Sequence, residues 1–584
     1  MKHTRRSWWH LLATLVAFTL VATACGDGNS ENNTVTDNTE PVERLYGDDD
    51  NDGATSTSEA QYGGSISVAL EAETDNWLPG MGQLTVNSAM TVSRTFFDPL
   101  TMLNGDDEVV PFLAESVEPN SNLDVWTVTL RDGVRFHDGS RLDAETLVWN
   151  FDTLHNIEGS NTAGTINDYG IDEVEATGAL TVEYRLSSPN SGFPAALRNS
   201  LGLPVSRQSY EEMGRDAFAE APVGTGPFVF QSWTRDDRLV VTRNDRYWRS
   251  DEDGNQLPYL DQITFFPIAD EDSRYQSLAA DSVQVMMTLR GSNAKQVIDL
   301  AEERNYRADL TVTNSSGSSI FNTQRPPVDD VRVRRALVAA SDGDSVAFIL
   351  GDDGLVPNNN QFFSPENQWY SDVAAAAYPS ADGPDVDLAE ELLADYIDDP
   401  DRSDGRNPGD PIEIEYACPP DPSLLEIGQL YQDLWGNLGG GGMVEISLRQ
   451  VQQPELIGNA LSGDYMINCW RSGADEGDPL VTFQSWFSDP STNPLNFTNF
   501  THPEIDEAIE ELRTSTDFEV RYAAAERINV IANENSILTW ATATPHVIGW
   551  RDDLNGFTSW VMPNGDPGRG TRGAIIDFSQ IWQS

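Results

Sequence analysis

The sequence predicts a mixed α/β protein built from two lobes, and three observations lead to this expectation. The chain has 584 residues, which is more than one hydrophobic core usually organises. Segments with the alternating pattern of strands are interleaved with segments of helical periodicity. The pair Pro326-Pro327, followed by a capped helix start at Asp329-Asp330, separates two such series. We therefore expect a lobe boundary close to this point.

The amino-terminal segment has the pattern of an exported lipoprotein. Basic residues precede an apolar run from Leu11 to about Ala24, and this run is too short to span a bilayer. Small residues lead directly into Cys25 and resemble the lipobox at which lipoprotein signal peptidase cuts. We expect residues 1–24 to be a signal peptide and Cys25 to carry the lipid. The alternative is cleavage nearby with no role for Cys25.

The segment 25–61 and the net charge indicate where the protein works. Residues 25–61 are rich in Asn, Asp, Thr, Ser and Gly and poor in apolar side chains, which predicts a disordered acidic tether. Ninety-four acidic residues against 36 basic ones give a formal net charge of -58. This charge repels nucleic acid and anionic membrane surfaces, so we expect neither as a ligand. The expected location is the extracytoplasmic face of the cell membrane, which is the periplasm in a two-membrane organism.

The elements of the first lobe follow from alternation and capping. Ile66–Leu70 and Trp126–Leu130 alternate as strands, and Asp143 can cap a helix. That helix places Leu147, Val148, Phe151 and Leu154 on one face. Further strands are expected at Leu180–Leu186, Phe228–Phe230, Arg238–Arg243 and Gln262–Pro267, with helices near Ser273–Ala280 and Ala294–Glu303.

The second lobe begins with a helix from Val331 to Leu337. Strands are then expected at Pro411–Ala417, Val444–Gln450 and Tyr465–Trp470, and helices at Pro422–Leu438, Pro503–Arg513 and Phe518–Glu534. The run Gly439–Gly442 is a loop or a helix terminus. It is not a phosphate-binding loop, because Lys and Ser or Thr do not follow the glycines.

One motif points to a family. The segment Trp126–Gly139, which reads Trp-Thr-Val-Thr-Leu-Arg-Asp-Gly-Val-Arg-Phe-His-Asp-Gly and is followed by Leu142–Val148, resembles the signature of bacterial extracellular solute-binding protein family 5. Three further stretches match in order: Pro222–Phe228, Asn244–Trp248, and Phe321-Asn322 leading to Val331–Leu337. The chain is thus similar to the oligopeptide- and dipeptide-binding lipoproteins of ABC importers.

Some residues of these motifs are expected to be structural. The signature itself reads as two strands, two tight turns and a capped helix, so His137 within it is predicted to support the scaffold. Gly224 and Gly226 suit a strand that crosses between subdomains, where the backbone turns sharply or approaches another strand.

The resemblance implies a two-lobed periplasmic-binding-protein type II fold with an extra subdomain in lobe one and a two-strand hinge. Lobe one would comprise residues 62–322 plus 544–584, with the extra subdomain at about 101–222, and lobe two would comprise residues 323–543. The crossovers would be Ser319–Thr323 and Leu538–Ala543. A ligand buried between the lobes would contact both of them in the closed state.

The resemblance also implies a function. The protein would capture peptides and deliver them to an ABC transporter permease and its ATPase, as a monomer without a cofactor. The alternatives are the same fold binding an oligosaccharide, a metal chelate or another small solute, or acting as a sensory receptor, because a fold does not choose its ligand.

The segment Trp470–Pro479 contains the expected ligand anchor. Peptide-binding members carry an aspartate three residues before an acidic-Pro pair, and Asp475 has this spacing to Asp478-Pro479. In those proteins the carboxylate pairs with the α-ammonium group of the peptide. Two additional residues after Trp470 leave Asp478 or Glu476 as alternative anchors. Asp478 is therefore retained as a candidate contact.

Other residues are candidates for ligand contact on weaker grounds. Trp470 and Trp486 either line the cleft or belong to the core. Arg471 either binds a ligand carboxylate or neutralises Asp475. Phe321 and Asn322 lie at the expected first crossover and are included for that reason.

The remaining reactive residues do not indicate an enzyme. Cys418 and Cys469 each lie in or at the end of a strand-like run, and either form a disulfide or remain as two buried thiols. The sequence has no Gly-x-Ser-x-Gly elbow and no His-Glu-x-x-His motif. Only four histidines follow Cys25, and none of them pairs at metal-ligand spacing. We expect neither catalysis nor a metal site.

Overall fold

The computed structural model describes residues 60–84, 86–157, 160–314, 319–351, 354–470, 477–491, 495–573 and 575–584. Three of the sequence-based predictions lie outside these residues: the signal peptide, nearly all of the tether with Cys25, and the segment that contains Arg471, Asp475 and Glu476. None of the helices in the described ranges is both long and apolar enough to cross a membrane.

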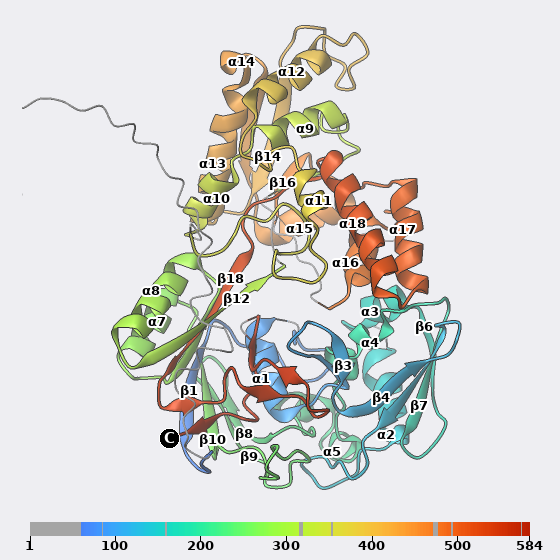
Figure 1. Ribbon diagram of the computed structural model, residues 1–584, viewed down its shortest axis with the longest axis vertical. Helices are drawn as coiled ribbons and strands as arrows, with labels where there is room; N and C mark the ends of the chain where they lie inside the picture. The colour runs from blue at the N-terminus through green and yellow to red at the C-terminus, as the bar shows by residue number, and fades with distance from the viewer. Residues whose placement is uncertain are drawn as a thin grey trace, which may run out of the picture. The chain divides into compact units, whose positions relative to one another are not determined.

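A seven-stranded mixed sheet organises the first lobe (Figure 1). The strand order is β12-β18-β11-β1-β10-β9-β8, and β1 runs parallel to both β10 and β11. The strands are β1 (Ser65–Leu70), β8 (Phe228–Thr234), β9 (Arg238–Arg243), β10 (Gln262–Pro267), β11 (Val285–Thr288), β12 (Tyr306–Thr313) and β18 (Thr544–Arg551). Strands β1, β8, β9 and β10 lie at the predicted positions, whereas β11, β12 and β18 were not predicted as strands.

Helices cover both faces of this sheet. Val68 and Leu70 of β1 pack with α1 (Asn87–Phe96) in one apolar cluster. Ala69 points to the opposite face and packs with residues of α7 (Glu271–Ala279) and α8 (Gly291–Glu303). This change of face at each residue is the two-residue period of a strand that is buried on both sides.

A separate four-stranded antiparallel sheet lies within the range expected for the extra subdomain. Its order is β4-β5-β7-β6, with β4 (Ala114–Pro119), β5 (Val125–Leu130), β6 (Ile171–Ala176) and β7 (Thr181–Leu186). It is covered by α2 (Ala144–Asn150), a π-helical turn (Phe151–His155), α3 (Ala163–Tyr169) and α4 (Phe193–Ala196). Asp143 caps α2 by accepting a hydrogen bond from the Thr146 N–H at 2.9 Å, as predicted. We call residues 101–202 the subdomain.

The second lobe is built around a five-stranded sheet with the order β15-β14-β16-β13-β17. The strands are β13 (Ser319–Phe321), β14 (Ile412–Cys418), β15 (Val444–Gln450), β16 (Ile467–Cys469) and β17 (Leu538–Thr539). The helix α13 (Pro422–Gly436) packs Tyr431 and Trp435 against Tyr416 of β14, with ring centroids 5.9 Å apart in both pairs. Gly439 and Gly440 adopt left-handed backbone angles, so the glycine run ends this helical region as expected.

The remaining elements are helices of both lobes and short strand pairs. The helices are α5 (Arg207–Met213), α6 (Arg215–Glu220), α9 (Val331–Ala339), α10 (Gly343–Leu350), α11 (Asp372–Ala376), α12 (Val386–Ile397), α14 (Leu438–Gly441), α15 (Gln453–Ser462), α16 (Pro479–Phe487), α17 (Pro503–Thr514) and α18 (Phe518–Glu534), with a 3-10 turn at Ser200–Gly202. Short antiparallel pairs are β2 (Thr101–Leu103) with β3 (Val109–Pro111), β19 (Leu554–Asn555) with β24 (Trp582–Gln583), β20 (Trp560–Val561) with β21 (Pro567–Gly568), and β22 (Thr571–Arg572) with β23 (Ile575–Ile576).

The chain changes sheets twice. It leaves the seven-stranded sheet after β12 and enters the five-stranded sheet at β13, and it returns between β17 and β18. Since β13 already pairs with β16 and β17, the first change of sheet occurs before Ser319 rather than at the expected boundary after Asn322. We accordingly define lobe one as residues 60–314 with 544–584, and lobe two as residues 319–543.

The family motifs contact one another in lobe one. The His137 N–H donates to the Gly224 carbonyl, and the His137 ring Nε2 lies 2.9 Å from the Gly226 carbonyl oxygen. Burial lowers the pKa of His137 to about 4, so this ring is neutral at pH 7 and supports the scaffold. A Cβ at Gly224 would lie 2.0 Å from the Phe96 carbonyl oxygen. The close approach predicted for these glycines therefore exists, but it is made to the end of α1 and not to a strand.

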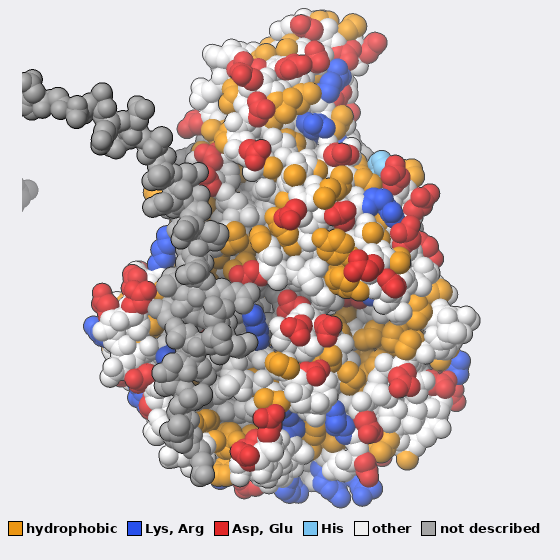
Figure 2. Space-filling view, viewed as in Figure 1, with side chains coloured by type: hydrophobic (Ala, Val, Ile, Leu, Met, Phe, Trp, Pro, Cys, Tyr) orange, Lys and Arg blue, Asp and Glu red, His pale blue; other side chains and the backbone are white. Residues whose placement is uncertain are grey.

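Acidic side chains are spread over the face of the molecule that Figure 2 shows. Figure 2 shows acidic side chains distributed across the visible face rather than gathered in one patch. A distribution of this kind favours solubility and does not indicate a single acidic binding surface.

Candidate ligand site between the lobes

The carboxyl ends of β14 and β16 form the edge of lobe two from which the predicted ligand loop leaves. The two strands are parallel, with Tyr416 opposite Ile467 and Ala417 opposite Asn468. They end at Cys418 and Cys469, which the structure joins in a disulfide with a Cα separation of 5.0 Å. In open α/β sheets, ligands bind beyond the carboxyl ends of the strands. The disulfide thus joins the two strand ends, Cys418 of β14 and Cys469 of β16.

Trp470 follows this disulfide directly and is only partly buried. Its ring lies 4.8 Å from that of Phe497, measured between centroids, and it packs on an apolar cluster of Ala417, Val451 and Leu456. One part of the indole is therefore fixed by lobe two while another part remains accessible. This position suits an aromatic side chain at the wall of a cleft.

Asp478 already has protein partners. Its carboxylate caps α16 by accepting from the Leu480 N–H at 2.8 Å, and it forms an ion pair with the Arg521 guanidinium of α18 at 2.7 Å. Both side chains of the pair are largely buried. A carboxylate held in this way fixes the start of a helix, so Asp478 has a structural role, while the other expected anchors, Asp475 and Glu476, lie outside the described residues.

Three other candidates lie inside lobe two. Trp486 is 6% exposed and packs on Phe362 with a centroid separation of 5.4 Å. Phe321 is fully buried in the same core. Asn322 donates to the carbonyl oxygens of Gly463 and Tyr465 at 2.9 and 3.0 Å. These contacts favour the core alternative for Trp486 and give Phe321 and Asn322 structural roles next to the first crossover.

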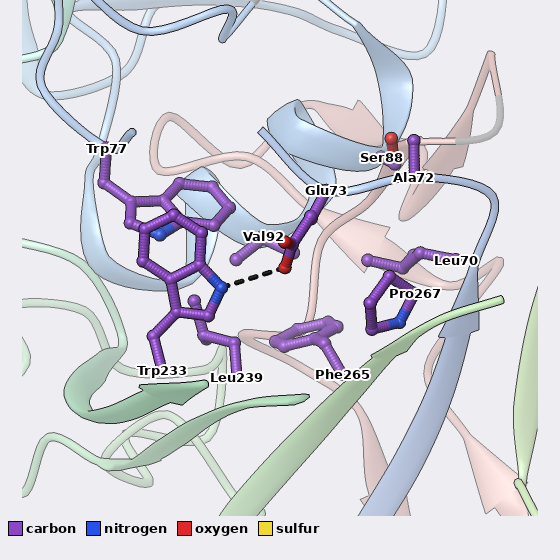
Figure 3. A pocket seen from close by; sticks show the side chains of 10 residues that line it. All are labelled: Leu70, Ala72, Glu73, Trp77, Ser88, Val92, Trp233, Leu239, Phe265 and Pro267. Atoms are coloured by element: carbon purple, nitrogen blue, oxygen red, sulfur yellow. Dashed lines mark hydrogen bonds between the residues drawn. The ribbon is translucent and has the colours of Figure 1, made fainter. Parts of the chain in front are cut away.

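Lobe one presents the carboxyl ends of its parallel strands β1 and β10 together with the start of α1. A small pocket lies there, and its whole lining comes from lobe one: Leu70, Ala72, Glu73, Trp77, Ser88, Val92, Trp233, Leu239, Phe265 and Pro267 (Figure 3). Figure 3 shows the Glu73 carboxylate reaching the Trp233 indole N–H, at a distance of 3.0 Å. A second bond from the Asp236 N–H at 2.9 Å completes the anchoring of Glu73.

The pocket contains unused polar atoms. The Trp77 Nε1 and the Ser88 Oγ are buried and have no hydrogen-bond partner within the described part of the chain. Glu73, Trp77 and Ser88 were not predicted as site residues from the sequence. The signal that could have found them is their position after the first strand of a parallel pair, where ligand-binding loops occur in α/β sheets.

Polar side chains also lie where the chain passes between the lobes. The Asn314 Oδ1 accepts from the Ser364 N–H of lobe two at 2.9 Å. His546 of β18 lies 3.3 Å from the Asn87 side-chain nitrogen of α1, measured from Nδ1. The first bond joins the end of β12 to a loop of lobe two, and the second joins the start of α1 to β18 within lobe one. Over the residues that the structure describes, no group of three or more His, Cys, Asp or Glu side chains has the arrangement of a metal site.

Comparison with protein families and relatives identifies the family of the chain. The sequence model of the family described as "Bacterial extracellular solute-binding proteins, family 5 Middle" matches residues 108–505. The chain is 24% identical to the dipeptide-binding protein of Escherichia coli (strain K12) over 458 residues, which cover 74% of this chain and 80% of that protein. It is 23% identical to the oligopeptide-binding protein OppA of Bacillus subtilis (strain 168) over 538 residues, covering 87% and 89% of the two chains.

Solved structures share the fold. The ABC transporter substrate-binding protein CtaP of Listeria monocytogenes superposes with a TM-score of 0.71 at 19% identity, covering 90% of this chain and 100% of that chain. The periplasmic binding protein DppA of Helicobacter pylori, in complex with the peptide STSA, gives a TM-score of 0.69 at 18% identity, covering 90% and 98%. The chain therefore belongs to family 5 of the bacterial extracellular solute-binding proteins and has the type II periplasmic-binding-protein fold.

Proposed function

We propose that the protein is a lipid-anchored extracytoplasmic receptor that captures peptides between its lobes and delivers them to an ABC permease and its ATPase. The observation that carries this proposal is the family match over residues 108–505, combined with two sheets joined by two crossovers. Relatives named as dipeptide- and oligopeptide-binding proteins support peptides as the ligand class. The cycle requires binding, closure and release by a monomer, and it requires no catalysis and no cofactor.

The proposed binding mode places the peptide beyond the ends of β14 and β16. Trp470 would contact it from the wall of the cleft, and Asp475 would pair with its α-ammonium group. Arg471 would neutralise Asp475 or take a ligand carboxylate. An ion pair that is removed from water in a closed cleft is stronger than the same pair at a surface, so the charge of Asp475 would matter for affinity.

The test is thermal unfolding of the protein against di- to pentapeptides, oligosaccharides and metal chelates. A compound that binds only the folded state raises the midpoint. Trialanine should raise it, and N-acetyl-trialanine should not, because it lacks the α-ammonium group. A rise with oligosaccharides or chelates alone would keep the family and refute the peptide proposal.

A pair of variants tests the anchor. Asp475→Ala should abolish the shift caused by trialanine, whereas Asp398→Ala, which removes an exposed carboxylate in lobe two, should leave it unchanged. An equal shift in Asp475→Ala and the parent would refute Asp475 as the anchor.

The lipid anchor has its own test. Cys25→Ala should move the protein from the membrane fraction to the soluble fraction of cells, because the thiol of Cys25 is the proposed site of lipidation. A Cys25→Ala protein that stays in the membrane fraction would refute the proposed anchor.

A further inference from the structure

The subdomain of lobe one meets lobe two far along the chain from either crossover. The Gln484 side-chain nitrogen lies 3.5 Å from the Asp168 carbonyl oxygen, and the Gln368 side-chain nitrogen lies 3.3 Å from the Asp107 carbonyl oxygen. Val481 of α16 packs on the apolar core of the subdomain. Figure 1 shows α16 and α17 of lobe two next to α3 and α4 of the subdomain. The subdomain therefore touches lobe two by hydrogen bonds and by apolar packing.

The strongest of these contacts is made by Ser191. Its N–H donates to the Arg513 carbonyl at 2.8 Å, and its hydroxyl donates to the Leu512 carbonyl at 2.7 Å. Both carbonyls belong to the last turn of α17, where a helix cannot satisfy its own acceptors. Ser191 is 6% exposed, so these bonds are protected from water. A residue of lobe one thus caps a helix of lobe two.

The turn that carries Ser191 is held firmly by the subdomain. The Asn190 carbonyl accepts from the Trp126 indole N–H at 3.1 Å, and the Asn190 side chain accepts from the Gly192 N–H at 3.0 Å. Trp126 lies in β5 and is buried. The turn is therefore fixed to the sheet of the subdomain and moves with it as one body.

Gly192 extends the contact to the ion pair of lobe two. A Cβ at Gly192 would lie 2.7 Å from the Asp478 Oδ2, which is closer than such atoms approach in folded proteins. Asp478 in turn caps α16 and pairs with Arg521 of α18. The subdomain therefore rests on the carboxylate that fixes the start of α16, and a side chain at position 192 would require either the Asp478 carboxylate or the subdomain to shift.

We infer that the Ser191-Gly192 turn is a latch that closes the subdomain onto α16 and α17 and slows the release of ligand. This inference rests on the proposed function, since closure matters only if a ligand is held between the lobes. Separating the lobes would break both Ser191 bonds, so these bonds stabilise the arrangement in which the subdomain contacts lobe two over any arrangement in which the two are apart. Contacts that exist in just one of two states shift the equilibrium toward that state, and they raise the affinity of a ligand that requires that state. The extra subdomain thereby acquires a role in closure.

The latch can be tested without any ligand by amide hydrogen exchange on the full chain. The Ser191 N–H should be protected in the parent because its acceptor lies in the other lobe. Gly192→Ala should lower that protection about tenfold, because a Cβ at this position overlaps with the Asp478 carboxylate and weakens the contact between the lobes. Ser191→Ala should lower the protection of its own amide about two- to tenfold, the worth of one hydrogen bond. Gly164→Ala, also in the subdomain and with open space around its Cα, is the matched control and should leave it unchanged.

A second measurement separates the latch from general destabilisation and from the proposed function. In Gly192→Ala the dissociation rate of trialanine should rise about tenfold, while protection of the Val128 amide in the middle of β5 stays at the parent value. Parent-like exchange at residue 191 in Gly192→Ala would overturn the latch. A parent protein that shows the latch but binds no trialanine, other peptide or solute would overturn the proposed function alone.

Discussion

Reduction of the bond between Cys418 and Cys469 should destabilise the protein by about 4 kcal/mol. The two residues are 51 positions apart, and the entropy that a loop of this length regains in the unfolded chain corresponds to about 4 kcal/mol at 25 °C. Both side chains are buried, at 0% and 3% exposure, and their Cα atoms are 5.0 Å apart. The reduced thiols therefore remain packed in the folded state, and we expect the native fold to persist at 25 °C with a lower resistance to denaturant.

Urea unfolding monitored by tryptophan fluorescence, with and without a phosphine reductant, measures the effect. The double variant Cys418→Ala/Cys469→Ala should show the lower midpoint without reductant and should not respond to reductant. Thiol titration of the unfolded, unreduced parent should detect neither cysteine. The reasoning would be refuted by equal midpoints for the reduced and oxidised parent, or by two titratable thiols.

Three further predictions concern lobe stability. Burial raises the pKa of Asp98 from 3.8 to about 6, so the folded state binds this proton more tightly than the unfolded state, and the contribution of Asp98 to stability falls as the pH rises through that window. Between pH 4 and pH 7, the unfolding free energy of the parent should therefore fall by about 2 kcal/mol relative to that of Asp98→Asn, as measured by urea titration. The guanidinium of Arg402 is fully buried and pairs with Asp404 at 2.7 Å, so Arg402→Ala should cost about 3 kcal/mol by thermal unfolding, and a loss below 1 kcal/mol would contradict the pairing. Gly224→Ala, whose Cβ would meet the Phe96 carbonyl, should cost about 2 kcal/mol or more on the same assay, with a neutral result counting against the close approach.

Local signals allowed much of the fold to be predicted from the sequence. Asp143 predicts the start of α2, because the side chain of an N-cap aspartate accepts a hydrogen bond from a backbone N–H of the first turn, as Asp143 does here. By contrast, α1 begins after Val86, which offers no side-chain cap, and this helix was not predicted. β18 contains Pro545 and Gly549, which argue against a central strand. A Cβ at position 549 would lie 2.4 Å from Val297 of α8, so α8 can pack closely on the strand only because this residue is glycine.

The site was predicted less completely than the fold, and the reasons are physical. Periodicity does not distinguish an aromatic side chain of the core from one that lines a cleft, and Trp486 proves to pack in the core while Trp470 is partly accessible. From the sequence, Asp478 resembles an acidic residue of a surface loop. In the structure it pairs with Arg521, which lies 43 residues further along the chain. The Ser191 hydroxyl donates to the Leu512 carbonyl, which lies 321 residues further along the chain. A local sequence pattern does not predict a contact between residues so far apart in the sequence. Asp475 remains a prediction from family resemblance.

The position of β18 also has a consequence for the order in which the protein folds. β18 lies between β11 and β12 within the seven-stranded sheet, although it comes from residues 544–551 near the end of the chain. Lobe two is one continuous stretch from residue 319 to 543 and can complete its sheet from its own residues. Lobe one has to leave a gap in its sheet until β18 arrives, which is a contact of long sequence separation and slow to form. The sheet of lobe one is therefore completed only after the whole of lobe two has been synthesised, because β18 follows lobe two in the chain.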